Sequence, residues 1–185
     1  MSLFDEEEKE IEYSSEYNRA RKRAMYLLGS RDYSTACLKE KLLNNYSEET
    51  AERVIEDMKR YGFLDDEEYA RKLAASLIKG KKYGVYRAKS EMKRKGIDAS
   101  TAEEALSAYE KEDYSEQLVA LIQKKYSDKI QDRDDRRRTV SALVRRGYGF
   151  SEIKEAVLTV LEEQAEEEDC GQDDDDDNDD EWEND

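Results

Sequence analysis

The chain has 185 residues, no proline, no histidine and a formal net charge of -16. Its length allows one medium domain or a few small repeats, and a mixture rich in Glu, Lys, Arg, Leu and Ala favours helices over strands. Without histidine, the commonest general base and metal ligand is missing, and Cys37 and Cys170 are too far apart in the sequence to suggest a zinc site. We therefore expect an all-α protein that is not an enzyme and needs no cofactor or metal.

The charge is distributed unevenly along the chain. Residues 162–185 hold 16 acids and no Lys or Arg, and residues 1–17 hold 7 acids and one Lys. The stretch between them, residues 18–161, carries 31 bases against 25 acids. The part that is expected to fold is thus basic and lies between two acidic ends.

The first predicted helices follow an acidic segment, through about Asn18, that we expect to be frayed or a loose helix. Apolar residues at helical spacing predict helices over residues 20–28, 37–42 and 51–58. Ser34 and Ser47 precede the second and third of these helices, where N-cap residues belong.

The next stretch combines a helix end with a helix start. Gly62 is expected to close one helix in the left-handed conformation, and Asp65, followed by Glu68, to cap the next. Phe63 and Leu64 between them should enter the core. Asp65 and Asp66 resemble paired carboxylates or a magnesium site, but capping is the favoured interpretation at a helix start. The structural motif consists of Gly62, Phe63, Leu64, Asp65, Asp66 and Tyr69.

The same pattern then recurs. Further helices are predicted over residues 69–77, 88–92 and 102–109, the last opened by a capping box at Ser100, and then over 118–122, 140–143 and 153–160. Equivalent apolar positions are 51 residues apart, as in Ala51, Ala102 and Ile153. This period predicts three tandem three-helix repeats that form an elongated curved body with a concave surface. The expected boundaries are 1–17 (acidic segment), 18–64, 65–112 and 113–161 (repeats) and 162–185 (disordered acidic tail).

Two basic clusters are the candidate binding residues. Tyr83 and Tyr86 are interleaved with the first cluster, although tyrosines are more often core or boundary residues than base-stacking platforms. If the repeats stack with a common face, the clusters form one stripe that binds phosphates or an acidic partner. Taken one at a time, the clusters are explained equally well as ordinary solvated helix faces. Their residues are Lys79, Lys81, Lys82, Arg87, Lys89, Lys93, Arg94 and Lys95 in the second repeat, and Arg136, Arg137, Arg138, Arg145 and Arg146 in the third.

Several motifs together resemble one known family. The run over residues 61–70, followed by 82–87 and 91–97, is similar to the central signature of RecX, a bacterial regulatory protein of RecA. Residues 24–34 resemble the first unit of that family and residues 143–157 its third. The resemblance covers residues 18–161. The chain departs from the family where Asn45 replaces the glycine that ends the second helix, and in its acidic tail.

The resemblance implies a non-enzymatic modulator, mainly an inhibitor, of RecA in DNA repair, recombination and the SOS response. Members of the family lie along RecA filaments on single-stranded DNA, impede ATP hydrolysis and strand exchange, and favour filament loss. The chain is then expected to be a cytoplasmic monomer that contacts single-stranded DNA directly or through RecA, and no membrane segment is expected. By position, the favoured contacts are Arg87, Lys93, Arg94, Lys95, Arg145 and Arg146.

A second function, of a different class from RecA regulation, is also compatible with the sequence. A helical-repeat adaptor or chaperone would use the acidic tail to hold basic partners. Within the RecX interpretation, two roles for the tail remain: it folds back on the basic face, with Trp182 as an anchor, or it keeps the protein soluble.

Overall fold

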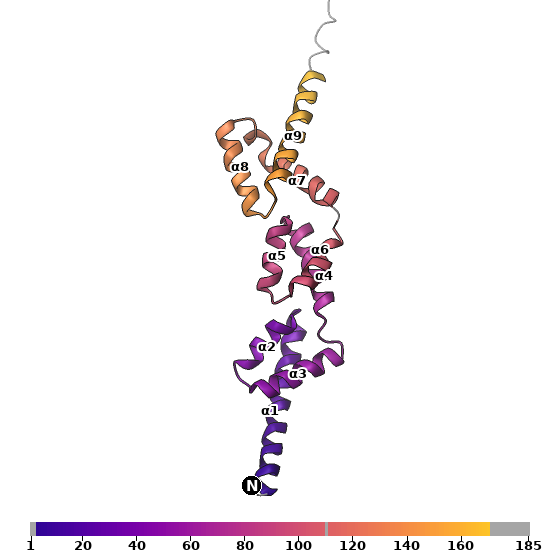
Figure 1. Cartoon of the computed structure of the whole chain (residues 1–185), viewed down its shortest axis with the longest axis vertical. Helices are drawn as coiled ribbons and strands as arrows, with labels where there is room; N and C mark the ends of the chain where they lie inside the picture. The colour runs from indigo at the N-terminus through magenta and orange to yellow at the C-terminus, as the bar shows by residue number, and fades with distance from the viewer. Residues whose placement is uncertain (1–2, 110, 171–185) are drawn as a thin grey trace, which may run out of the picture. The chain divides into compact units, whose positions relative to one another are not determined.

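The computed structural model describes residues 3–109 and 111–170, and side chains within 15–109 and 114–166. These residues form helices joined by turns and loops, with no β-strand among them (Figure 1). The prediction of an all-α fold with three three-helix repeats is confirmed. The elements are α1 (Leu3–Ser30), α2 (Thr35–Leu43), α3 (Glu48–Arg60), α4 (Asp66–Ala75), the π-helical turn η1 (Ser76–Gly80), α5 (Val85–Arg94), α6 (Ala99–Ser107), α7 (Lys111–Tyr126), the 3-10 turn η2 (Ser127–Lys129), α8 (Arg133–Arg145) and α9 (Phe150–Cys170).

The chain divides into two units, residues 1–109 and 110–185. In the first unit, α1 packs against α2 and α3 to form repeat 1, and α4 packs against α5 and α6 to form repeat 2. The predicted N-caps of repeat 1 are confirmed, because the hydroxyls of Ser34 and Ser47 accept hydrogen bonds from the amides of Cys37 and Thr50.

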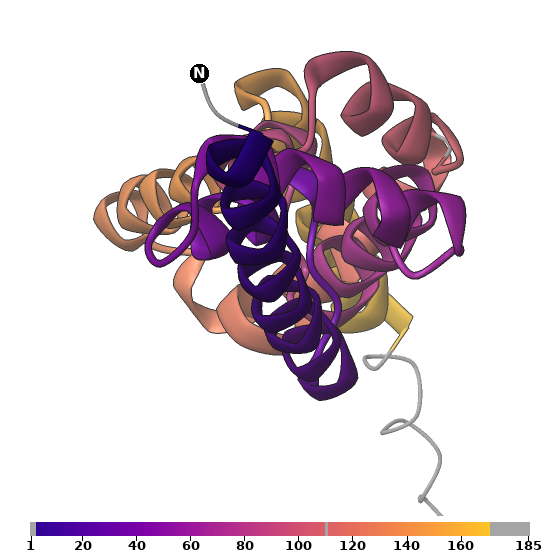
Figure 2. The same cartoon turned by 90° about the horizontal axis from the view of Figure 1, so that it is seen from below.

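Helix α1 includes the acidic N-terminal segment from Leu3 onward, where a frayed segment or a loose helix was expected. It is a continuous helix of 28 residues, drawn in dark indigo in Figure 2. Its Glu16 carboxylate accepts hydrogen bonds from the Ser47 amide (2.7 Å) and the Thr50 hydroxyl (3.0 Å) at the start of α3. The Ser47 amide and the two hydroxyls lower the pKa of Glu16. Residues assigned to the acidic segment therefore help to hold repeat 1 together.

The connection between α3 and α4 has the predicted glycine and cap. Gly62 has φ +73°, and the Asp65 carboxylate accepts from the Glu68 amide at 2.8 Å. Leu64 is buried, as expected, but Phe63 is 49 % exposed. The prediction that Phe63 fills the core was wrong, because successive residues of a non-helical connection point to opposite sides and Leu64 takes the inner one.

The two repeats of the first unit are joined where α5 ends and α2 begins. The Lys95 carbonyl accepts from the Ser34 hydroxyl (2.5 Å) and the Cys37 thiol (3.2 Å). At Gly96, which has φ +75°, an added Cβ would lie 2.7 Å from the Cβ of Ala36. Asp66 forms a further link, since its carboxylate accepts from the Thr35 amide at 2.8 Å. The predicted motif residue Asp66 thus joins repeat 2 to repeat 1.

The predicted start of α6 was wrong. Helix α6 is capped by Asp98, whose carboxylate accepts from the Thr101 amide at 3.0 Å, and Ser100 lies inside the helix. Asp98 provides a cap two residues upstream, so the helix starts earlier than the capping box at Ser100 suggested. After α2, Asn45 stands where the family has a glycine, but it does not take the left-handed conformation, and its amide donates to the Leu42 carbonyl at 3.0 Å.

The second unit contains repeat 3, in which α9 packs against α7 and α8. Helix α9 continues to Cys170, so residues 162–170 are helical where a disordered tail was expected. Their contacts explain the difference: Gln123 donates to the Glu163 carboxylate (2.6 Å) and Gln131 to the Gln164 side-chain carbonyl (2.7 Å). The rest of the predicted tail, with Trp182, lies outside the described residues. The buried core is formed by Leu118, Leu121, Ile122, Ile130, Leu143, Tyr148, Ile153, Ala156, Val157 and Val160.

Candidate binding surfaces on the second helices

The second helices of repeats 2 and 3, α5 and α8, position most of the candidate residues. Each helix buries one narrow side. In α5 that side carries Ala88 and Met92, and in α8 the equivalent Thr139 and Leu143. Because residues three and four apart share a helix face, many of the remaining positions of both helices are exposed, and these positions hold most of the basic residues.

The outer face of α5 combines bases with one exposed aromatic ring. Tyr86 is 71 % exposed and lies three residues before Lys89 and seven before Lys93, so the three share a face. Lys89 forms an ion pair with Glu103 of α6 at 2.8 Å. An exposed ring beside ammonium groups is a surface on which a base can stack while its phosphate is neutralised. The expectation that the tyrosines are core or boundary residues does not hold for Tyr86, whereas Tyr83 is half-buried.

Further bases gather around Tyr83 just before α5. The guanidinium carbon of Arg87 lies 4.4 Å from the centroid of the Tyr83 ring, and the ammonium of Lys81 lies 5.8 Å from it. Neighbouring Lys82 is exposed and has φ +55°. Contacts of this kind hold a cation against an aromatic face, so Tyr83 positions two of the candidate residues together at the start of the helix.

At the other end of α5 the bases are exposed. Arg94 pairs with Glu91 at 2.5 Å within the helix, and Lys93 and Lys95 are exposed beside it. The three residues fall at the C-terminal end of α5, where the helix dipole favours cations. Local charges thus stabilise these residues in place without burying them.

In α8 the arginines divide between two roles. The guanidinium of Arg136 turns inward and donates to the carbonyls of Ile130 (2.6 Å) and Gln131 (3.1 Å), which fixes the turn before the helix. Arg137 and Arg138 are exposed, and Arg138 pairs with Asp135 at 2.7 Å. The structure therefore brings Arg137 and Arg138 to the surface but uses Arg136 to hold the fold.

Bases that are exposed or half-buried recur at equivalent positions. With a step of 51 residues, Arg87 corresponds to Arg138, Arg94 to Arg145 and Lys95 to Arg146. From repeat 1 to repeat 2 the second helices are 50 residues apart, and the corresponding residues of repeat 1, namely Cys37, Asn44 and Asn45, are uncharged. Repeats 2 and 3 thus share a basic pattern that repeat 1 lacks. The continuity of these surfaces as one stripe stays a prediction.

The arrangement is suited to binding anions. Guanidinium and ammonium groups on solvated helix faces attract phosphates or carboxylates, and salt screens the attraction. Within the part of the chain that the structure describes, no group of three or more acidic or cysteine side chains is placed to hold a metal ion. Among the same residues, no helix combines the length and apolar character needed to cross a membrane.

Comparison with known proteins gives a consistent match over all three repeats. Residues 20–58 match a family model described as the first three-helix domain of RecX, residues 65–106 the second and residues 112–157 the third. The chain is 30 % identical to the regulatory protein RecX of Clostridioides difficile, over 85 % of this chain and 75 % of that protein. It is 32 % identical to the regulatory protein RecX of Prosthecochloris aestuarii, over 77 % of this chain and 94 % of that protein.

A solved structure has the same fold. The crystal structure of RecX from Lactobacillus salivarius superposes with a TM-score of 0.73 and covers 80 % of this chain and 97 % of that chain, at 19 % identity.

Proposed function

Since this chain belongs to the RecX family of regulatory proteins, we propose that it modulates a RecA recombinase by binding the filament that RecA forms on single-stranded DNA. It acts mainly as an inhibitor in DNA repair and recombination, as a cytoplasmic monomer and without chemistry of its own. The observation that carries the proposal is the recurrence of bases at equivalent positions along α5 and α8 and at their C-terminal ends.

The recurring bases suit a repetitive anionic partner. A filament on DNA presents phosphates and acidic side chains at regular intervals, and a protein with repeated basic faces can engage more than one interval at once. Each phosphate neutralised releases counterions, so binding weakens as salt rises. Because two linked contacts dissociate more slowly than one, the bound protein persists through several cycles of ATP hydrolysis and hinders the rearrangements that accompany them.

The contacts we propose are Arg87, Lys93, Arg94, Lys95, Arg137, Arg138, Arg145 and Arg146, with Lys81 and Lys82 beside them. Arg136 is left out of this set because its guanidinium is engaged with two backbone carbonyls. Tyr86 is added because its ring is exposed among the bases of α5.

RecA-dependent ATP hydrolysis on single-stranded DNA tests the proposal. The protein, added below stoichiometry with RecA, is expected to suppress hydrolysis. The double variant Lys93→Glu/Lys95→Glu should need about tenfold more protein for the same suppression, because it reverses two phosphate contacts.

The matched control is Lys22→Glu/Lys59→Glu, which makes the same change of charge at exposed positions of α1 and α3 and should behave like the parent protein. If the parent protein left hydrolysis untouched at every salt concentration, the filament proposal would fail. An adaptor that holds basic partners would then be the better assignment.

A further inference from the structure

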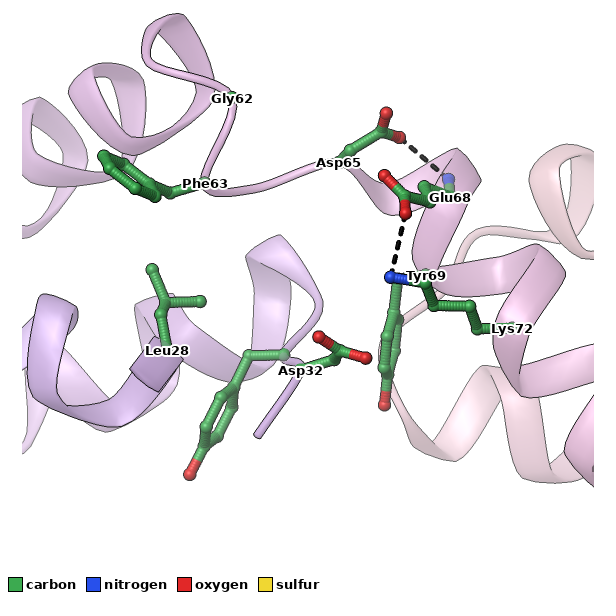
Figure 3. A pocket seen from close by; sticks show the side chains of 9 residues that line it. Leu28, Asp32, Gly62, Phe63, Asp65, Glu68, Tyr69 and Lys72 are labelled. Carbon is green, nitrogen blue, oxygen red and sulfur yellow. Dashed lines mark hydrogen bonds and ion pairs between the residues drawn. The ribbon is translucent and has the colours of Figure 1, made fainter. Parts of the chain in front are cut away.

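The structural motif of the sequence surrounds a pocket that the basic surfaces do not use. The pocket lies between repeats 1 and 2 inside the first unit and has a volume of about 230 Å³ (Figure 3). Its walls come from the end of α1, the connection around Gly62 and the first turns of α4. The capping and turn roles of the motif explain Gly62, Leu64 and Asp65, but they do not explain why Phe63 and Tyr69 face this pocket.

One half of the pocket is apolar. Phe63 is 49 % exposed, and Figure 3 shows its ring on the same side of the pocket as Leu28. The connection that carries Phe63 is fixed at both ends, by the left-handed Gly62 and by the Asp65 cap. A large apolar side chain held at the rim of a pocket contributes little to folding and offers area for a partner.

The other half is acidic and contains one internal cation. Asp32, Asp65 and Glu68 line it against the single ammonium of Lys72, which lies 2.8 Å from the Glu68 carboxylate. Glu68 raises the pKa of Lys72 most, followed by Asp32 and, more weakly, Asp65. Lys72 therefore shows that the field in this half of the pocket favours a positive charge, and three carboxylates exceed what one ammonium neutralises.

Tyr69 forms an aromatic wall beside these carboxylates. Its ring is half-buried, and Figure 3 shows the Asp32 carboxylate directed toward it. Burial raises the pKa of the Tyr69 hydroxyl, with further contributions that include the charge of Asp32. A neutral ring next to carboxylates that outnumber the one ammonium among them is an arrangement that suits a planar cation, which can stack on the ring and donate hydrogen bonds to the oxygens.

We propose that this pocket docks a protein partner through an arginine side chain that follows an apolar residue. The guanidinium lies over Tyr69 and bonds Asp32 and Glu68, and the apolar neighbour packs on Phe63. Arginine fits better than lysine because its planar fork both stacks and forms paired hydrogen bonds. Because its carboxylates repel phosphate, this pocket binds a protein partner, whereas the basic helix faces bind anions.

Comparing binding to RecA filaments with binding to bare single-stranded DNA distinguishes the protein contact of this pocket from the anion contacts of the basic helix faces. The choice of RecA as the test partner rests on the proposed function. Phe63→Ala and Asp32→Asn should each weaken binding to RecA filaments, by about tenfold for a central contact, and leave binding to bare single-stranded DNA unchanged. Phe150→Ala, at a ring that is 69 % exposed in the second unit, is the matched control and should change neither. Weaker binding to bare DNA by the Phe63→Ala protein would overturn the assignment to a protein partner.

A small probe tests the pocket without RecA. Acetyl-Leu-Arg-amide, titrated into the full chain, should shift the amide NMR signals of Phe63 and Tyr69, and acetyl-Leu-citrulline-amide, which has the same shape without the charge, should not. Equal shifts with both peptides, or no shift with either, would overturn the proposal. A protein that binds the arginine peptide but leaves RecA unaffected would show that the pocket exists and that the proposed function is wrong.

Discussion

Asp57 is a buried carboxylate in α3, and two side chains donate hydrogen bonds to it. It accepts hydrogen bonds from the Tyr17 hydroxyl and from the Arg60 guanidinium. The bond to Asp57 and, next to it, burial raise the pKa of Tyr17, because both favour the protonated phenol. At the residue scale, Tyr17 therefore stabilises the packing of α1 on α3, although the sequence pattern placed it in the acidic N-terminal segment.

Replacing Tyr17 by Phe should lower the free energy of unfolding by about 1.5 kcal/mol at pH 7, the lower end for a hydrogen bond to a charged group, because Asp57 keeps Arg60 as its other partner. Because the folded pKa of Tyr17 is raised, its contribution is complete below the ordinary tyrosine pKa of 10.0 and is lost as pH rises through the folded value. The difference in the free energy of unfolding between the parent and the Tyr17→Phe protein should therefore become smaller above pH 10.

Urea unfolding followed by circular dichroism between pH 7 and pH 11 measures this difference. Tyr26→Phe, at a side chain that is 70 % exposed, is the control and should match the parent protein at pH 7. A difference between the Tyr17→Phe and parent proteins that stays constant across this pH range would contradict the assigned role of the Tyr17 hydroxyl.

At the scale of elements, the end of α5 meets the start of α2 through a glycine. Gly96 serves two purposes there, since its φ of +75° closes α5 and its missing side chain leaves room for Ala36. The Lys95 carbonyl can then accept a hydrogen bond from the Ser34 hydroxyl, and the same hydroxyl caps α2. One residue thus couples the geometry of a helix end to the contact between two repeats.

Gly96→Ala should destabilise the protein by about 2 kcal/mol, because it adds the strain of a left-handed alanine to a steric overlap with Ala36. Gly29→Ala is the matched control: Gly29 lies within α1 with nothing within 4 Å of an added Cβ, so the substitution should be neutral or stabilising. Thermal unfolding of the three proteins checks the prediction, which fails if both variants have the same midpoint.

At the scale of the whole molecule, the acidic residues at the two ends of the chain and the bases of the repeats have opposite effects on the affinity for an anionic partner. The chain carries a formal charge of -16, and residues 171–185 alone contain 10 acids. Like charges on a protein and on DNA repel over about 10 Å at 0.1 M salt. The acidic residues should therefore reduce the affinity of the repeats for DNA and for filaments, most strongly at low ionic strength.

Deleting residues 171–185 leaves a charge of -6 and removes none of the contacts that Glu163 and Gln164 make with repeat 3. Affinity for single-stranded DNA should rise several-fold at 50 mM salt and converge with the parent protein at high salt. A variant with Ser and Gln in place of these acids, at the same length, should behave like the deletion. Unchanged affinity of both variants at low salt would exclude an electrostatic role for these residues.

Much of the fold could be predicted because local rules determine it. The 51-residue step of apolar positions, the caps at Ser34, Ser47 and Asp65 and the glycine at position 62 each depend on a few neighbouring residues, and the structure confirms them. The positions of most bases on the second helices could also be predicted from the sequence, because helical spacing places them away from the buried side.

Other features depend on residues that are distant in the sequence. Asp66 accepts from Thr35, 31 residues away, and the thiol of Cys37 donates to the carbonyl of Lys95, 58 residues away. Arg136 turns to the carbonyl of Ile130 while its neighbours stay exposed, and Phe63 faces a pocket because Leu64 occupies the core. The sequence by itself determined the helices, their repeats and the surplus of bases, because periodicity and capping are local. Only the tertiary structure decided which polar groups join the repeats and which motif residues stay available to a partner, because those roles depend on the surfaces that meet in space.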